Sequence, residues 1–229
     1  MFPRSVLISS LLGGSLALGA TPAVSQAQGR LVDEGTFIVT RPGAASATES
    51  FKIVRLDADL IQATGHESFG DEQITSSLKA DSLGTPIAYE LLMRTRNTPT
   101  LRVQAAFHGG RLSALSSDQH GNESMKEYPV ATGHCLILDD GLLHLTYFVA
   151  LSGRTGRLEV ISPRSARRLP STLTAHGMEP IQVAGHTVTA THYTLANATG
   201  TREFWVDSNG RLMRVEAGGA TAVREEMPR

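Results

Sequence analysis

Hydrophobic and polar residues alternate along most of this chain, and a period of two is typical of strands that bury one face. The pattern is clearest in 86–94, where Ile87, Tyr89 and Leu91 share one face. It returns in 100–107 after the turn residues 97–99, which predicts a hairpin. The runs predicted as strands are 36–41, 50–56, 74–80, 86–94, 100–107, 111–116, 187–195, 202–207 and 211–217.

Four further segments shape this prediction. The run 50–56 alternates poorly, which suggests a β-bulge there. The stretch 162–170 contains two prolines and is expected to form a loop, and the tail after Gly218 is expected to fray. By contrast, 208–210 reads Ser-Asn-Gly between two strand patterns, and Asn-Gly is a strong hairpin signal because both residues tolerate positive φ.

The segment 140–152 breaks the alternation and is apolar nearly all round, which predicts a short helix of about three turns. Asp140 is a favourable N-cap residue, and Gly153 is favourable just past the end of a helix. A helix without a polar face must be covered on most sides, and this one is too short to span a bilayer. We therefore expect the concave face of a sheet to cover it.

Many strand patterns with one helix, and no regular alternation of strands and helices, predict an all-β or β-dominated fold. A sheet with so many strands must curl, close or split. The expected fold is a large curved antiparallel sheet, a half-barrel, wrapped around one short apolar helix. No internal repeat or low-complexity linker is present in the sequence.

The first residues have the organisation of a secretory signal peptide. Arg4 precedes an apolar run over 6–18, and the small residues Ser25 and Ala27 offer a cleavage site before Gln28. The apolar run is shorter than the roughly 20 residues of a membrane-spanning helix. We expect residues 1–27 to be removed, leaving one antiparallel β domain over 28–229 that is periplasmic or secreted and has no integral membrane segment.

Composition narrows the function classes further. The chain has 21 Lys and Arg against 22 Asp and Glu, a formal net charge of −1, so it has no global electrostatic reason to bind nucleic acid. Cys135 is the single cysteine, so no internal disulfide forms and stability must come from packing. Cys135 stands in the apolar run 135–138, which favours a buried, unreactive thiol.

Several features together resemble a known kind of protein. They are the leader, the strand meander, the apolar segment 136–151 and the late hairpin around Phe204-Trp205-Val206-Asp207 and Gly210-Arg211-Leu212. This combination resembles bacterial exported half-barrel proteins of the lipoprotein-carrier (LolA/LolB-like) type, or related uncharacterised exported families. The resemblance implies a curved sheet closed by a helix around an apolar cavity for acyl chains. It assigns no binding residue position by position.

The sequence contains no recognisable catalytic or metal-binding motif. The eight histidines show no metal-ligand spacing, and the mature chain has neither a Gly-x-Ser-x-Gly elbow nor a glycine-rich phosphate loop. We therefore assign no catalytic residue, and expect no cofactor and no metal. Catalytic groups converge in space rather than in sequence, so an enzyme remains an alternative.

Four residues are candidate ligand contacts. His144 lies on the apolar helix four residues after Asp140, so the two side chains would share a face. His144 is then either a hydrogen-bonded core residue, or a polar anchor or acid–base group in a cavity. Arg164, Arg167 and Arg168 form a basic cluster that is either a solvated loop or a contact for a phosphate headgroup or an acidic partner.

These observations favour an exported β-domain that binds a hydrophobic or amphipathic ligand, such as a lipid, or a partner protein, without chemistry. One alternative is an exported hydrolase with a site at the sheet rim near His144. The other is a structural or assembly subunit that acts through a sheet edge.

Overall fold

The computed structural model describes residues 29–43, 45–57, 59–130 and 134–228. In this part of the chain, strands dominate and form one 15-stranded sheet, which confirms the predicted fold class. The predicted signal peptide lies outside the described residues. No helix in the described ranges is long and apolar enough to cross a membrane.

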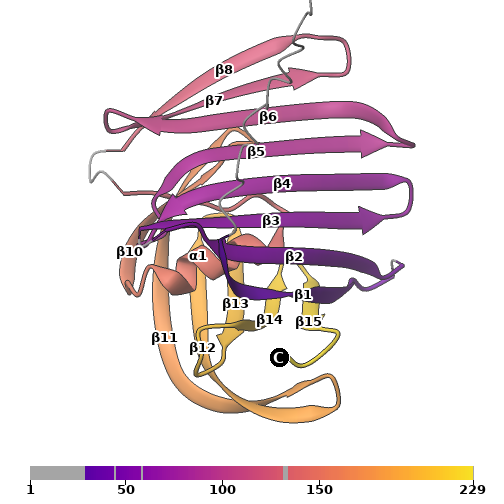
Figure 1. Cartoon of the computed structure of the whole chain (residues 1–229), viewed down its shortest axis with the longest axis vertical. Helices are drawn as coiled ribbons and strands as arrows, with labels where there is room; N and C mark the ends of the chain where they lie inside the picture. The colour runs from indigo at the N-terminus through magenta and orange to yellow at the C-terminus, as the bar shows by residue number, and fades with distance from the viewer. Residues whose placement is uncertain (1–28, 44, 58, 131–133, 229) are drawn as a thin grey trace, which may run out of the picture.

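The sheet consists of two meanders that meet in its middle (Figure 1). The strand order is β8-β7-β6-β5-β4-β3-β2-β1-β15-β14-β13-β12-β11-β10-β9, and β1 pairs with β15. The first arm contains β1 Arg30–Thr40, β2 Ala47–Arg55, β3 Leu60–Phe69, β4 Glu72–Asp81, β5 Pro86–Thr95, β6 Thr98–His108, β7 Arg111–Asp118 and β8 Glu123–Pro129. The second arm contains β9 Leu136–Ile137, β10 Gly156–Ser162, β11 Arg167–Val183, β12 His186–Asn197, β13 Gly200–Val206, β14 Leu212–Ala217 and β15 Ala220–Arg224.

One helical crossover fills the inside of the curved sheet. It joins β9 to β10, which form the single parallel pair among the pairings of the described strands, and it contains the 3-10 turn η1 Leu143–Leu145 and the helix α1 Thr146–Leu151. The turn η1 contacts β2 and β3, and α1 contacts β14, so the crossover bridges the two arms. Figure 1 shows α1 between the β2–β3 region and the strands of the second arm.

The crossover packs directly onto the strands. Leu142, Leu145 and Phe148 are fully buried in the same core as Phe37 and Ile53 from the inner face of the sheet. The predicted helix is therefore present and covered as expected, but the α-helix proper is shorter than three turns and begins at Thr146. Its hydrophobic side chains occupy the space where an acyl-chain cavity was expected.

Three local predictions are wrong. β2 alternates cleanly between buried and exposed residues, and the irregularity lies on β1, between Leu31 and Asp33. β11 begins at Arg167, so the loop after β10 is limited to 163–166. The segment after Gly218 does not fray, because β15 pairs with both β1 and β14.

A buried ion pair helps to hold β15 in the middle of the sheet. The Arg224 guanidinium pairs with the Asp33 carboxylate and lies over the Phe37 and Phe51 rings, 5.9 and 5.0 Å from their centroids. It also donates to the Leu212 carbonyl at 2.6 Å. A deeply buried charge is costly unless it is paired and hydrogen-bonded. The Arg224–Asp33 pair therefore favours the pairing of β15 with β1.

The second arm carries a smaller core on the opposite face of the sheet. Along β13, Phe204 and Val206 join the main core, whereas Trp205 points the other way and packs with Met213 and Ile181. β12 pairs with β13 only from Thr191 onward, so the free end of the β11–β12 hairpin is able to bend across this face. Figure 1 shows that hairpin curving beneath the strands of the second arm.

Polar contacts join the two arms away from the β1–β15 seam. The Lys126 ammonium on edge strand β8 donates to the Ala166 carbonyl at 2.5 Å, in the turn between β10 and β11. The Tyr89 hydroxyl on β5 donates to Asp139 at 2.6 Å, and Ser162 on β10 donates to the other oxygen of that carboxylate at 2.5 Å. These contacts give the open sheet a barrel-like form.

Candidate functional site

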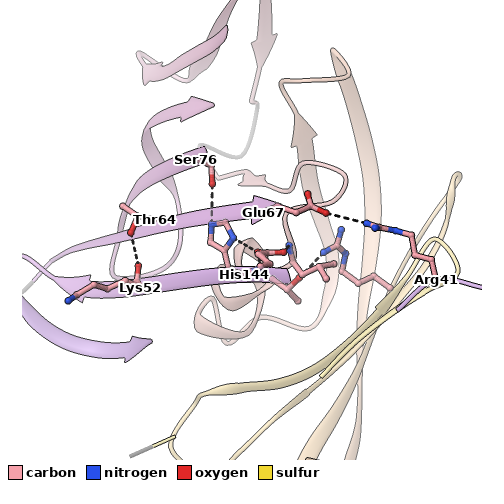
Figure 2. A network of polar contacts seen from close by, with 10 residues as sticks. Arg41, Lys52, Thr64, Glu67, Ser76 and His144 are labelled. Carbon is pink, nitrogen blue, oxygen red and sulfur yellow. Dashed lines mark hydrogen bonds and ion pairs between the residues drawn. The ribbon is translucent and has the colours of Figure 1, made fainter. Parts of the chain in front are cut away.

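A row of three polar side chains lies inside the main core. The carboxylate of Glu49 on β2 and the Nδ1 atom of His144 in η1 are 2.5 Å apart, and the Nε2 atom of His144 is 3.3 Å from the Oγ atom of Ser76 on β4. Glu49 and His144 are fully buried, and Ser76 is 7% exposed. Figure 2 shows the His144 ring pointing toward Ser76.

Gly65 on β3 makes room for this row. It stands opposite Ser76 in the sheet, and a Cβ atom at position 65 would lie 2.2 Å from the Cε1 atom of His144. The imidazole ring therefore lies against bare backbone, and only glycine permits this approach. In the sequence of β3, the site is marked by a glycine at an inward-facing position, where a hydrophobic residue would be expected.

Glu49 also replaces the predicted helix cap. Its carboxylate accepts the backbone N–H groups of Leu143 and His144, both at 2.8 Å, at the start of the helical segment. The Nδ1 atom of His144 faces the same carboxylate, and its Nε2 atom faces the Ser76 hydroxyl on the other side of the ring. Asp140 does not cap the helix or meet His144 as predicted, because its side chain pairs with Arg167.

The order Ser, His, Glu is the arrangement of a nucleophile, a base and an orienting acid in serine hydrolases. A shallow depression of about 240 Å³ touches Ser76, but it also includes Thr75, Ser77 and Glu90, which project from the opposite face of the strands. The hydroxyl of Ser76 faces the filled core. In the described part of the chain, the row is therefore surrounded by core side chains.

A second buried carboxylate lies beside the row. Glu67 on β3 is the cross-strand neighbour of Glu49 and pairs with Arg41 at 3.3 Å, as Figure 2 shows. Burial raises the pKa of Glu67, the nearby Glu49 charge raises it further, and Arg41 opposes both effects. Glu67 borders a pocket of about 310 Å³ that Arg164 and Phe69 also line.

Asp139 forms a further buried polar cluster at the start of the crossover. It accepts hydrogen bonds from Tyr89, from Ser162 and from the backbone N–H of Arg164. Burial raises the pKa of the Asp139 carboxyl, and the hydrogen bonds from Ser162 and Tyr89 oppose this increase. The cluster connects β5, β10 and the crossover, so its evident role is structural.

The three arginines of the predicted basic loop do not form one site. Arg164 donates to the Asp140 carbonyl at 3.0 Å and borders the pocket beside Glu67. Arg167 pairs with the Asp140 carboxylate and lines a different pocket. Arg168 pairs with Glu159 and lines a third pocket. Alternation along the start of β11 sends neighbouring side chains in different directions.

The pocket at Arg168 is lined by both apolar and basic side chains, and we call it the β10 pocket. It has a volume of about 290 Å³ and lies beside β10 and the end of α1. Its lining residues are Leu83, Thr85, His134, Cys135, Leu136, Ser152, Arg154, Arg157, Leu158, Glu159, Arg168 and Pro170. Burial raises the pKa of the Cys135 thiol to about 12, so the thiol stays protonated, as the sequence predicted for an unreactive cysteine.

The β10 pocket combines segments that carry no common sequence pattern. Leu83 precedes β5, Leu136 belongs to β9, and Arg154 and Arg157 flank the start of β10. Sequence reasoning therefore named one of its members, Arg168, as a ligand contact, placed Cys135 in a buried run, and assigned no role to the others. Among the described residues, no three His, Cys, Asp or Glu side chains come together as a metal site would require.

Comparisons with known proteins agree with this fold and leave the site unassigned. No curated protein matches the chain in sequence. The chain resembles the crystal structure of a beta-barrel-like protein of the domain of unknown function DUF1849 from Brucella abortus, with a TM-score of 0.54 and 11% sequence identity. The match covers 86% of this chain and 96% of that one, so it extends over both arms of the sheet.

The similarity to that structure supports a beta-barrel-like fold and does not show a specific relation to lipoprotein carriers. A family model, described as a domain of unknown function (DUF6134), matches residues 85–222. The matched segment runs from the beginning of β5 to β15 and contains the crossover, most of the β10 pocket and His144. The chain therefore belongs to the DUF6134 family.

Proposed function

We propose that this protein is an exported, non-catalytic binding protein and that the β10 pocket receives a small amphipathic ligand. The single observation that carries the proposal is the pocket itself, which has an apolar wall and several basic side chains at one place. Ligand sites are typically concave and mainly apolar, with a few polar groups that orient the ligand.

The size of the pocket limits the ligand. A volume of about 290 Å³ corresponds to roughly ten water molecules at ~30 Å³ each. It is at the small end of ligand pockets, which span about 300–1,000 Å³. We therefore propose a short or medium acyl chain as the apolar part, rather than the larger cargo that the resemblance to lipoprotein carriers would imply.

The two alternative functions have weaker support. The Ser76–His144–Glu49 row has the residue types of a hydrolase, but it faces a filled core. The exposed edge strand β8 carries Glu123, Lys126 and Glu127, and charged side chains at an edge disfavour pairing with another strand.

Removal of the apolar wall tests the proposal. Leu83 lines the pocket and is 48% exposed, so Leu83→Ser should fold normally and weaken binding of a medium-chain amphiphile, measured by calorimetry with octanoate as the probe. Leu31→Ser is the matched control, because Leu31 is 47% exposed and lies in β1. Equal affinities of wild type and both variants, or no binding to wild type, would contradict the proposal.

The single cysteine gives an independent readout. Cys135 lines the same pocket, and its raised pKa makes the thiol react slowly near neutral pH. Labelling with a small thiol reagent is therefore followed at alkaline pH, where a bound ligand should slow it further. The protection should saturate with octanoate concentration and disappear in Leu83→Ser. Slower labelling in that variant to the same extent as in wild type would show that octanoate acts elsewhere.

A further inference from the structure

The charged residues around the β10 pocket are unbalanced. Three arginines, Arg154, Arg157 and Arg168, line it together with one carboxylate, Glu159, which gives a formal charge of 3 − 1 = +2 when His134 is neutral. A pocket with low-dielectric walls concentrates the field of such charges. The β10 pocket is therefore electropositive on a protein whose formal net charge is −1.

The excess positive charge resides on two of the three arginines. Arg168 pairs with Glu159, so its charge is already compensated. Within the described ranges, neither Arg154 nor Arg157 forms an ion pair with the protein. They stand on either side of Gly156, where the chain enters β10, so both side chains border the same end of the pocket.

We propose that Arg154 and Arg157 bind the anionic headgroup, a carboxylate or a phosphate, of the ligand whose chain lies against Leu83, Leu136 and Leu158. This inference rests on the proposed function and adds the chemical class of the ligand. Guanidinium groups donate paired hydrogen bonds to the planar or tetrahedral oxygens of such anions. The contacts replace the Arg164, Arg167 and Arg168 cluster that the sequence suggested.

A set of three eight-carbon probes tests the headgroup. Octanoate, octyl phosphate and 1-octanol share one chain and differ in headgroup charge, and calorimetry measures their affinities for the mature protein. We expect both anions to bind at least tenfold more tightly than octanol, because hydrogen bonds between guanidinium groups and an anion are stronger than those to a neutral hydroxyl. The ratio of the two anion affinities distinguishes a carboxylate site from a phosphate site.

The double variant Arg154→Ser/Arg157→Ser assigns the effect to these residues. It should reduce the affinity for both anions about tenfold or more and leave that for octanol unchanged. Raising the salt concentration should weaken anion binding to wild type but not to the variant. The matched control, Arg94→Ser/Arg102→Ser, removes two arginines from β5 and β6, outside the β10 pocket, and should bind all three probes as wild type does.

The outcomes separate this inference from the proposed function. Equal binding of all three probes to wild type would overturn the anionic headgroup and leave the pocket as an apolar binding site. A preference for anions that survives in the double variant would overturn the assignment to Arg154 and Arg157. Absence of binding by any probe would overturn the proposed function itself, and the inference with it.

Discussion

At the scale of single residues, the buried polar groups distinguish this core from an ordinary β-protein core. His144 was recognisable as an isolated polar residue in an apolar segment, but its partner was not. Glu49 precedes it by 95 residues, and the strand pairing that brings them together has no local signal. A sequence pattern identifies a side chain that needs a partner, while only the fold supplies that partner.

The space at Gly65 allows a sharp test of the buried row. Gly65→Ala should destabilise the protein by about 1–3 kcal/mol, because the new methyl group overlaps the His144 ring. The free energy of unfolding from urea titration measures this. In a His144→Ala background the same change should cost much less, since the ring is gone. Equal costs in the two backgrounds would show that position 65 does not make room for the imidazole.

The raised pKa of the Asp139 carboxyl predicts that the stability of the protein depends on pH. This pKa is raised by burial above the ordinary value of 3.8, so the folded state holds the proton more tightly than the unfolded state. Protonation of Asp139 therefore stabilises the folded state as the pH falls through the range just above 3.8. This contribution to the free energy of unfolding is lost as the pH rises through the same range. Wild type should gain stability relative to Asp139→Asn when the pH falls from 7 to 4.

The measurement is the difference in free energy of unfolding between the two proteins at each pH. Each unit of raised pKa corresponds to about 1.4 kcal/mol. Glu123→Gln, at an exposed site on β8, is the control for a charge removed without burial. A difference between wild type and Asp139→Asn that is constant with pH would contradict the burial of an ionisable carboxyl at this position.

At the scale of elements, the crossover illustrates what periodicity reveals. The all-round apolar character of 140–152 correctly predicted a covered helical segment. It overestimated the helix because the residues of α1, including Thr146, Tyr147 and Val149, have modest helix propensity. The segment is held in its helical form by burial and by hydrogen bonds to the Glu49 carboxylate, and not by the helix propensity of its residues.

A charge placed in the crossover should therefore prevent folding. Leu145→Asp or Phe148→Asp buries an unpaired carboxylate at a fully buried position, which costs several kcal/mol against the roughly 5–15 kcal/mol stability of a domain. Thermal unfolding followed by circular dichroism measures this, with Leu31→Asp as the exposed control. Melting within a few degrees of wild type would show that the crossover is not central to the core.

Two of the strands that were not predicted, β3 and β11, have interrupted patterns for physical reasons. β3 carries Gly65 and Glu67 on its inner face, so its alternation of apolar and polar residues is interrupted at the polar row. The pairing of β11 with β12 shifts between Ala175 and Gly177, and the buried residues change face across this bulge. A period-two pattern is lost wherever polar groups are buried or a strand changes face.

At the scale of the whole molecule, the curved sheet around one helix followed from the number of strands and the single apolar segment. The strand order that closes the sheet could not be predicted from the sequence pattern. Phe37 pairs with Arg224, and Lys126 contacts the turn at Ala166, so the contacts that shape the molecule join distant parts of the chain. The β10 pocket depends on the same long-range contacts, which is why sequence reasoning named only Arg168 as a ligand contact there.

Export is the prediction that concerns the full chain. We expect cleavage between Ala27 and Gln28, because Ser25 and Ala27 provide the two small residues that signal peptidase recognises. N-terminal sequencing of protein recovered from the periplasm or medium measures the cleavage position. A chain that retains Met1, or that stays with membranes after a carbonate wash, would contradict the prediction.

The seam between β1 and β15 has a consequence for biogenesis. Because β1 is made early and β15 late, the middle of the sheet is the last part to acquire its hydrogen bonds. Until then both strands present bare edges, which favour association with other chains. Contacts this distant in sequence also slow folding. A chain that has not yet been completed would therefore remain vulnerable to aggregation until its last strand is available, which gives a chaperone a reason to bind it during that interval.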